Sequence, residues 1–278
     1  MKSEKLKVKN KPQAKAKAVR VKKKEKKVVK KIKGKKLQEL TSLSPIDLKA
    51  LLEAGCHFGH RISKTHPKSI PFLYGKRGGV QIFDLIKTAQ YLEEARDFLF
   101  KLAAKGEKVL LVGTKRQAKK IIRKIALETK MPFVHNRWLG GTLTNWEEMN
   151  KRIKRLKKLT GQIEEGVFKS RTKKEQSLIR KEIVDLREKF GGMSSLEELP
   201  SALLVVDIMR EKIAVAESRY ANIPIVAIAD SNTDPGLVDY PIPGNDDARK
   251  SIELIVGLLG EAIIKGSKSE KKQTAKSG

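Results

Sequence analysis

Apolar residues follow two different spacings along this chain, and each spacing indicates a kind of secondary structure. Four short, mostly apolar runs, at 108–112, 131–134, 201–207 and 223–230, are bounded by polar or turn-forming residues. Such runs are typical of strands that are buried on both faces. Between them, apolar residues recur at helical intervals. Strands that alternate with helices predict a three-layer α/β fold, a mostly parallel sheet flanked by helices.

Turn and capping residues indicate where several elements begin. Ser44 is suited to cap a short helix, with Pro45 at its first position. Residues 80–83 alternate as a short strand does, and Asp84 is placed to cap the helix that follows. An Ile/Leu-rich helix over 246–264 closes the domain.

The interval 144–192 breaks the alternation of strands and helices. Its apolar residues step by three and four, as Trp146, Met149 and Ile153 do, and the pattern resumes after a polar interruption. This is the seam of two helices packed along one narrow stripe, so we expect an inserted antiparallel helical hairpin, a coiled coil. Capping boxes and a glycine pair mark its helix ends: Thr144-x-x-Glu147, Thr172-x-x-Glu175 and Gly191-Gly192.

The predicted elements divide the chain into four parts. They are a Lys-rich N-terminal extension over 1–43, an α/β domain over 44–143 and 193–264, the inserted hairpin over 144–192, and a basic C-terminal tail over 265–278.

The chain carries a formal charge of +29 over 278 residues, which indicates a polyanionic partner. Residues 1–36 hold eighteen Lys or Arg against Glu4 and Glu25, with no aromatic ring. We expect this stretch to be disordered in isolation and to order only on RNA. The alternative is a solubilising tail without a target.

Cysteine content and hydropathy indicate a compartment. Cys56 is the only cysteine, so no internal disulfide forms, which suits a reducing environment. No apolar run approaches the ~20 residues that cross a bilayer, and the N-terminus lacks the apolar core of a signal peptide. We therefore expect a cytoplasmic protein without a membrane partner.

Residues 136–146, the Trp loop, join a predicted strand to the hairpin and hold both tryptophans of the chain. Trp138 and Trp146 are candidates for stacking on RNA bases, and the alternative is that both pack at the hairpin base. The first hairpin helix carries cations without balancing acids over 151–158. Phosphate contacts are expected from Lys64, Lys68, Lys76, Arg77, Lys115, Arg116, Arg137, Lys151, Arg152, Lys154, Arg155, Lys157, Lys158, Lys173 and Lys174.

An enzyme is the rival hypothesis, because α/β folds often bind nucleotides. Neither glycine-rich phosphate-binding pattern occurs in the chain. The loop 113–117 still follows a strand and precedes a helix, and it offers backbone donors and two cations to an anion. The rival is a doubly wound nucleotide-binding enzyme with its site at this loop and basic accessory tails. A chromatin-like DNA-binding protein would fit the tails but not the buried sheet.

A metal site is a further candidate. His60, Asp230, Asp246 and Asp247 offer an imidazole and three carboxylates, a set that suits zinc or a harder cation such as magnesium. The alternative is that the histidine makes a structural hydrogen bond and the aspartates cap turns. No cofactor is required by either hypothesis.

Several motifs together resemble one family, that of bacterial small-subunit ribosomal protein S2. They span roughly residues 44–264. In order they are LLEAGCHFGH at 51–60, VGTKR at 112–116, RWLGGTLTN at 137–145, TKKE at 172–175, IP at 223–224 and IPGNDD at 242–247.

The resemblance implies a three-layer α/β domain with a protruding coiled coil. It implies a structural, non-catalytic role on the small ribosomal subunit near the head–body junction, bound to 16S rRNA and without a small-molecule substrate. It also implies recruitment of ribosomal protein S1 during translation initiation. Cys56 departs from the small aliphatic residue usual at its position, and the Lys-rich stretch 1–36 lies outside the common pattern.

Overall fold

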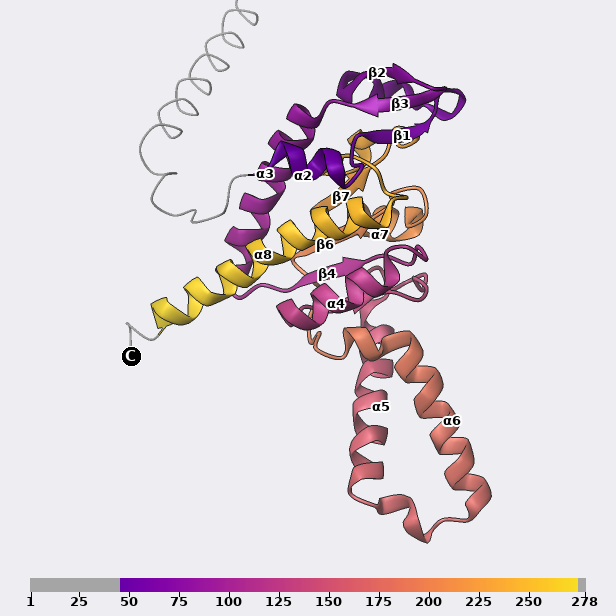
Figure 1. Cartoon of the computed structure of the whole chain (residues 1–278). Helices are drawn as coiled ribbons and strands as arrows, with labels where there is room; N and C mark the ends of the chain where they lie inside the picture. The colour runs from indigo at the N-terminus through magenta and orange to yellow at the C-terminus, as the bar shows by residue number, and fades with distance from the viewer. Residues whose placement is uncertain (1–45, 275–278) are drawn as a thin grey trace, which may run out of the picture. The chain divides into compact units, whose positions relative to one another are not determined.

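A five-stranded parallel sheet forms the middle layer of the folded chain (Figure 1). The computed structural model describes residues 46–274, so the predicted N-terminal extension over 1–43 lies outside the described residues. The strand order is β5-β4-β6-β7-β8, and each neighbouring pair is parallel. The strands are β4 (Val109–Val112), β5 (Phe133–Val134), β6 (Ala202–Val206), β7 (Ile225–Ala229) and β8 (Tyr240–Pro243).

Helices cover both faces of this sheet, which confirms the α/β prediction. Alternate strand residues face opposite layers: Leu111 belongs to one core and Leu110 to the other. The Leu111 side is covered by α2 (Leu48–Glu53), α3 (Leu85–Ala103), α4 (Lys119–Thr129) and α8 (Arg249–Thr274). The Leu110 side is covered by α7 (Lys212–Tyr220) and by the roots of α5 (Trp146–Glu164) and α6 (Lys173–Phe190).

A second, three-stranded antiparallel sheet was not predicted. Its order is β1-β3-β2, with β1 (Phe58–Arg61), β2 (Leu73–Arg77) and β3 (Val80–Phe83). Short 3₁₀ turns, η1 (Ile62–Lys64) and η2 (Pro67–Phe72), join β1 to β2. Only β3 was expected, because β2 is polar and mostly exposed and therefore lacks an apolar pattern.

The hairpin consists of α5 and α6, joined through the 3₁₀ turn η3 (Val167–Ser170). Ile153, Leu156 and Ile183 are buried where the helices meet, whereas Ile163 near the tip is 39% exposed. The two helices are thus as expected, and the coiled coil stays a prediction. At the root, the 3₁₀ turn η4 (Gly191–Met193) passes close to β5: a Cβ on Gly192 would lie 2.2 Å from the Phe133 carbonyl oxygen.

Several helix boundaries differ from the sequence predictions. Asp47 caps α2, and its carboxylate accepts from the backbone N–H of Lys49, whereas the predicted start at Ser44 and Pro45 lies outside the described residues. The predicted capping box at Thr172 is confirmed, whereas α5 has Asn145 at its N-cap and no side-chain cap. Thr144 bonds elsewhere, as described below.

The last helix is longer than expected, running to Thr274 instead of ending at 264. Gly266 lies against α3, where an added Cβ would be 2.5 Å from the Phe100 carbonyl oxygen. Close packing of the two helices therefore continues into the predicted tail. Within residues 46–274, no helix combines the length and apolar character needed to cross a bilayer.

Candidate nucleic-acid interface

One buried carboxylate holds the Trp loop in place. Glu217 on α7 accepts hydrogen bonds from the backbone N–H groups of Gly141 (2.8 Å), Leu143 (2.9 Å) and Thr144 (3.3 Å). The indole Nε1 of Trp138 (3.2 Å) and the hydroxyl of Thr144 (3.4 Å) also donate to it. Thr144 therefore donates to Glu217 within this loop and does not form the capping box that its spacing predicted.

Trp138 is a core residue, which corrects its prediction as an RNA-stacking residue. Its side chain is 6% exposed and packs in the core on the Leu110 side of the sheet, beneath the root of the hairpin. A base would have to displace Glu217 and neighbouring apolar groups to reach the ring. Trp146 is half-buried and packs against the same core. The alternative, that the tryptophans pack at the hairpin base, describes Trp138.

A second internal carboxylate occupies the loop after β4. Glu211, 3% exposed, accepts from the backbone N–H of Thr114 at 2.8 Å. Burial raises the pKa of Glu211, and the hydrogen bonds from Thr114 only partly oppose that effect. The backbone donor at Thr114 is thus already bound to a protein carboxylate. This is the loop where the rival hypothesis placed a nucleotide phosphate.

Lys115 is buried among aspartates, which corrects its prediction as a phosphate contact. Its Nζ lies 2.6 Å from Asp247 Oδ1, 2.7 Å from Asp246 Oδ1 and 3.1 Å from Asp207 Oδ2. Burial alone would lower the pKa of Lys115, but these carboxylates together raise it. Lys115 follows β4 and Asp207 follows β6, so their ion pair lies at the carboxyl edge, where the strand order reverses. Doubly wound enzymes bind their ligands at that point.

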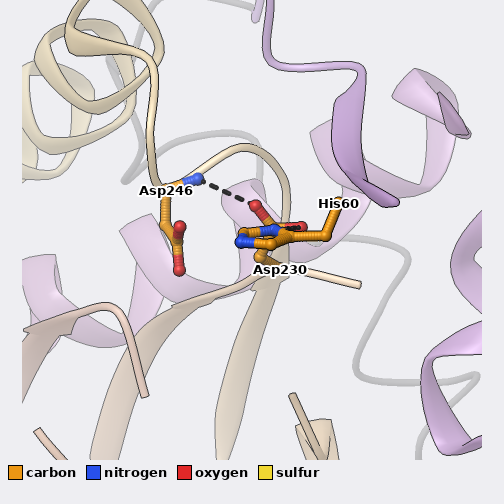
Figure 2. A group of neighbouring side chains, drawn as sticks. All are labelled: His60, Asp230 and Asp246. Carbon is orange, nitrogen blue, oxygen red and sulfur yellow. Dashed lines mark hydrogen bonds and ion pairs between the residues drawn. The ribbon is translucent and has the colours of Figure 1, made fainter. Parts of the chain in front are cut away.

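Three of the four residues predicted as metal ligands, His60, Asp230 and Asp246, come together at the same edge (Figure 2), and Asp247 lies beside His60. His60, on β1, places Nδ1 3.0 Å from Asp230 Oδ1 and Nε2 3.4 Å from Asp247 Oδ2. Ligand atoms of His60, Asp230 and Asp246 all lie within 4.8 Å of one another. Asp247 is exposed and also pairs with Lys115.

Burial and neighbouring charges change the proton affinities in this cluster. Burial, followed by the nearby carboxylates of Asp230 and Asp207, raises the pKa of Asp246 to about 7. The hydrogen bond to Asp230 raises the pKa of His60. The cluster therefore attracts positive charge, whether a proton or a metal cation.

The small antiparallel sheet brings His60 to this edge. The backbone N–H of His60 donates to the Ser231 hydroxyl at 2.8 Å, directly after β7. Gly59 allows this approach, because a Cβ there would lie 2.8 Å from the same oxygen.

The outer face of α5 is cationic and exposed. Lys151 pairs with Glu148, and Arg155 pairs with Glu182, both at 2.6 Å. The remaining predicted hairpin cations form no ion pair with any described residue, and all are exposed: Arg152, Lys154, Lys157, Lys158, Lys173 and Lys174.

The other predicted phosphate contacts are also on the surface. Lys64, Lys76 and Arg77 are exposed on or beside the small sheet, as are Arg116 and Arg137 in their loops. Lys68 is exposed as well, but its ammonium pairs with Asp234 at 2.5 Å. Asp234 is the N-cap of the 3₁₀ turn η5 (Pro235–Leu237).

Three acidic residues that hold the loops of this region were not predicted from the sequence: Glu211, Glu217 and Asp207. Each bonds to a group far along the chain, as Glu217 does to residues 73–79 positions earlier. The only local signal was a glutamate among the apolar residues of α7. Spacing alone does not indicate such a partner.

Glu211 binds a backbone donor in the loop after β4, where the rival hypothesis placed a phosphate, Glu217 binds the donors of the Trp loop, and a cationic helical projection extends from the body (Figure 1). This is the architecture of an α/β protein with an inserted, cationic helical hairpin. The model of the family described as ribosomal protein S2 matches residues 51–266. The small ribosomal subunit protein uS2c of Cyanophora paradoxa is 45% identical over 222 residues, 80% of this chain and 95% of that protein. The chain therefore belongs to the ribosomal protein S2 family of small-subunit structural proteins, and it is not an enzyme.

Proposed function

We propose that the protein is a structural constituent of the small ribosomal subunit that binds 16S rRNA through the outer face of its hairpin. The observation that carries this proposal is the set of exposed cations on α5 without ion-pair partners among the described residues, Arg152, Lys154 and Lys158. Family membership supports the ribosomal setting.

Electrostatics explains why unpaired cations matter here. A Lys or Arg that already pairs with a protein carboxylate must lose that partner before it binds phosphate. Cations without such partners bind phosphates and release condensed counterions, which makes the affinity strongly salt-dependent. Lys115 belongs to the first kind, and Arg152, Lys154 and Lys158 on α5 belong to the second.

The test replaces Arg152, Lys154 and Lys158 with Ala together. The control replaces Arg219, Lys101 and Lys105, which are exposed outside the hairpin and remove the same charge. We expect the hairpin variant to bind 16S rRNA more weakly, with a log affinity–log salt slope shallower by about 2–3, at roughly 0.7–0.9 per phosphate contact. The control should keep the wild-type slope. Equal slopes in both variants would contradict the proposal.

We further propose that the protein acts on cytoplasmic ribosomes, lies near the head–body junction and supports initiation by recruiting ribosomal protein S1. The position at the head–body junction and the recruitment of S1 rest on the family resemblance. The cytoplasmic location rests on the single cysteine and on the lack of an apolar signal-peptide core at the N-terminus. Small subunits assembled without this chain should retain less S1 on a sucrose gradient than complete subunits. Equal S1 content in both preparations would contradict the recruitment role.

We also propose that His60, Asp230 and Asp246 hold a divalent cation. One imidazole and two carboxylates suit zinc better than magnesium, which prefers oxygen ligands and retains several waters. Their ligand atoms converge within 4.8 Å, and Lys115 alone balances only part of the charge of four nearby aspartates. The cation would join β1 to the ends of β7 and β8.

Metal analysis of the purified full chain tests this second proposal. We expect about one zinc per chain and a lower melting temperature in a chelator. His60→Ala should lose the bound zinc, and its melting temperature should not change in the chelator. His57→Ala is the control, because His57 lies outside the cluster. A metal-free chain whose melting temperature is the same with and without the chelator would exclude the site.

A further inference from the structure

A groove opens where the root of the hairpin meets the edge strand β5. We call it the hairpin groove; it has a volume of about 890 Å³, and α4, β5, α5, α6 and η4 all contribute to its lining. Four apolar side chains belong to it: Phe133, Leu156, Leu127 and Val184. Leu127 and Val184 are 64% and 63% exposed, so the apolar surface is accessible to a ligand.

Cations outnumber acids around this apolar surface. Arg123, Lys157 and Arg187 line the groove together with Glu164 and Glu188. Within residues 46–274, none of these three cations forms an ion pair. The groove therefore combines apolar contact surface with unpaired positive charge, as proteins that bind single-stranded nucleic acids do.

Two ring side chains add a stacking surface and a hydrogen-bonding edge. Phe133 and His135 both line the groove, with ring centroids 5.2 Å apart. Burial lowers the pKa of His135, and the charges of Arg123 and Lys119 lower it further. A neutral imidazole presents one donor and one acceptor, which is what a base edge pairs with.

A glycine keeps one wall open. Gly161 lies in the last turn of α5, a helical position at which glycine is less favourable than alanine. A Cβ added there would meet no atom within 4 Å, so internal packing does not require glycine at this position. The absent side chain leaves space for a flat group to lie against the helix backbone.

We propose that the hairpin groove binds an unpaired segment of the ribosomal RNA. Bases contact the apolar surface and the rings of Phe133 and His135, while phosphates bind Arg123 and Arg187 at the rim. An RNA duplex is the poorer fit, because its bases are stacked inside and it presents mainly phosphates and ribose hydroxyls. The inference deepens the proposed function and rests on it, because it assigns part of the RNA contact to the inner side of the hairpin.

A photo-cross-linker placed in the groove tests this inference in assembled small subunits. Val184→p-benzoylphenylalanine puts the probe on the α6 wall, and Tyr220→p-benzoylphenylalanine on α7 serves as a control for exposure alone, since Tyr220 is 81% exposed. Each is combined with Gly161→Leu, which fills the groove. Gly257→Leu is the matched control, because a Cβ there also meets no atom within 4 Å and Gly257 lies outside the groove.

We expect an RNA adduct from position 184 that maps to unpaired nucleotides. Gly161→Leu should reduce it about tenfold, which corresponds to losing the stacking of roughly one base, whereas Gly257→Leu should leave it unchanged. An adduct to a protein, an adduct to paired nucleotides, no adduct, or an RNA adduct insensitive to Gly161→Leu would each overturn the inference. Absence of the wild-type chain from small subunits would instead contradict the proposed function.

Discussion

Single carboxylates determine the local structure around the candidate interface. Glu217 satisfies the donors of a loop whose backbone would otherwise carry one buried and two partly buried N–H groups without this acceptor. Buried polar groups without partners are costly, so this one side chain fixes the root of the hairpin.

Replacing Glu217 with Ala should lower the free energy of unfolding by about 3 kcal/mol, because several donors lose their acceptor together. Urea titration followed by tryptophan fluorescence measures this, since Trp138 donates to the same carboxylate. Glu198→Gln, at an exposed position, is the control and should be neutral. A Glu217→Ala chain as stable as the control would show that the loop does not depend on this acceptor.

Glu211 should make stability depend on pH. Burial raises its pKa, so the folded chain holds a proton at Glu211 above the pH at which the unfolded chain releases it. This group therefore stabilises the fold less as the pH rises from about 4.5 through the raised pKa.

Thermal melts of wild type and Glu211→Gln in chelator, from pH 4.5 to 8, test this sign. The stability difference, wild type minus variant, should fall as the pH rises. A difference that is constant across this range, or that grows with pH, would contradict a raised pKa.

The residue scale also shows what the sequence alone could predict. His60, Asp230, Asp246 and Asp247 were proposed together as metal ligands, and they do converge. Lys115 was placed with the phosphate contacts, because a Gly-Thr-Lys-Arg loop does not reveal that aspartates from two other strand ends surround its ammonium.

At the scale of elements, strands with a clear apolar or alternating pattern were predictable, whereas β2 and β8 were not. Residues 201–207 are almost wholly apolar, and β6 lies among them. β2 is mostly polar, and β8 carries Pro241 and Pro243, which lack a backbone N–H. β8 tolerates both because it is an edge strand, where one side of the backbone needs no partner.

The hairpin tip should depend on the capping box of α6. Replacing Thr172 with Ala removes the acceptor of the Glu175 N–H and should cost about 1 kcal/mol in that turn. Hydrogen exchange should quicken in the first turn of α6 while the global unfolding transition stays unchanged.

Ser177→Ala, exposed on the same helix, is the control for the loss of a hydroxyl. Unaltered exchange after Thr172→Ala would mean that the cap does not stabilise the helix start.

On the scale of the whole molecule, some cations form ion pairs inside the protein and others remain on its surface without a carboxylate partner among the described residues. The cation at the carboxyl edge of the sheet, Lys115, is bound by aspartates, whereas the outer face of α5 keeps several cations free of carboxylates. Composition predicted a polyanionic partner for the chain as a whole, but only the fold separates cations that pair with protein carboxylates from those without such partners among the described residues.

Directed cleavage tests the orientation of the hairpin most directly. An iron chelate tethered at Lys158→Cys in assembled small subunits generates radicals that cut nearby RNA, and Cys56 is buried and so not expected to be labelled. We expect scission of 16S rRNA from position 158 and much less from Lys101→Cys, an exposed site on α3. No cleavage from 158 above that from 101 would contradict the claim that the cationic face of α5 lies against ribosomal RNA.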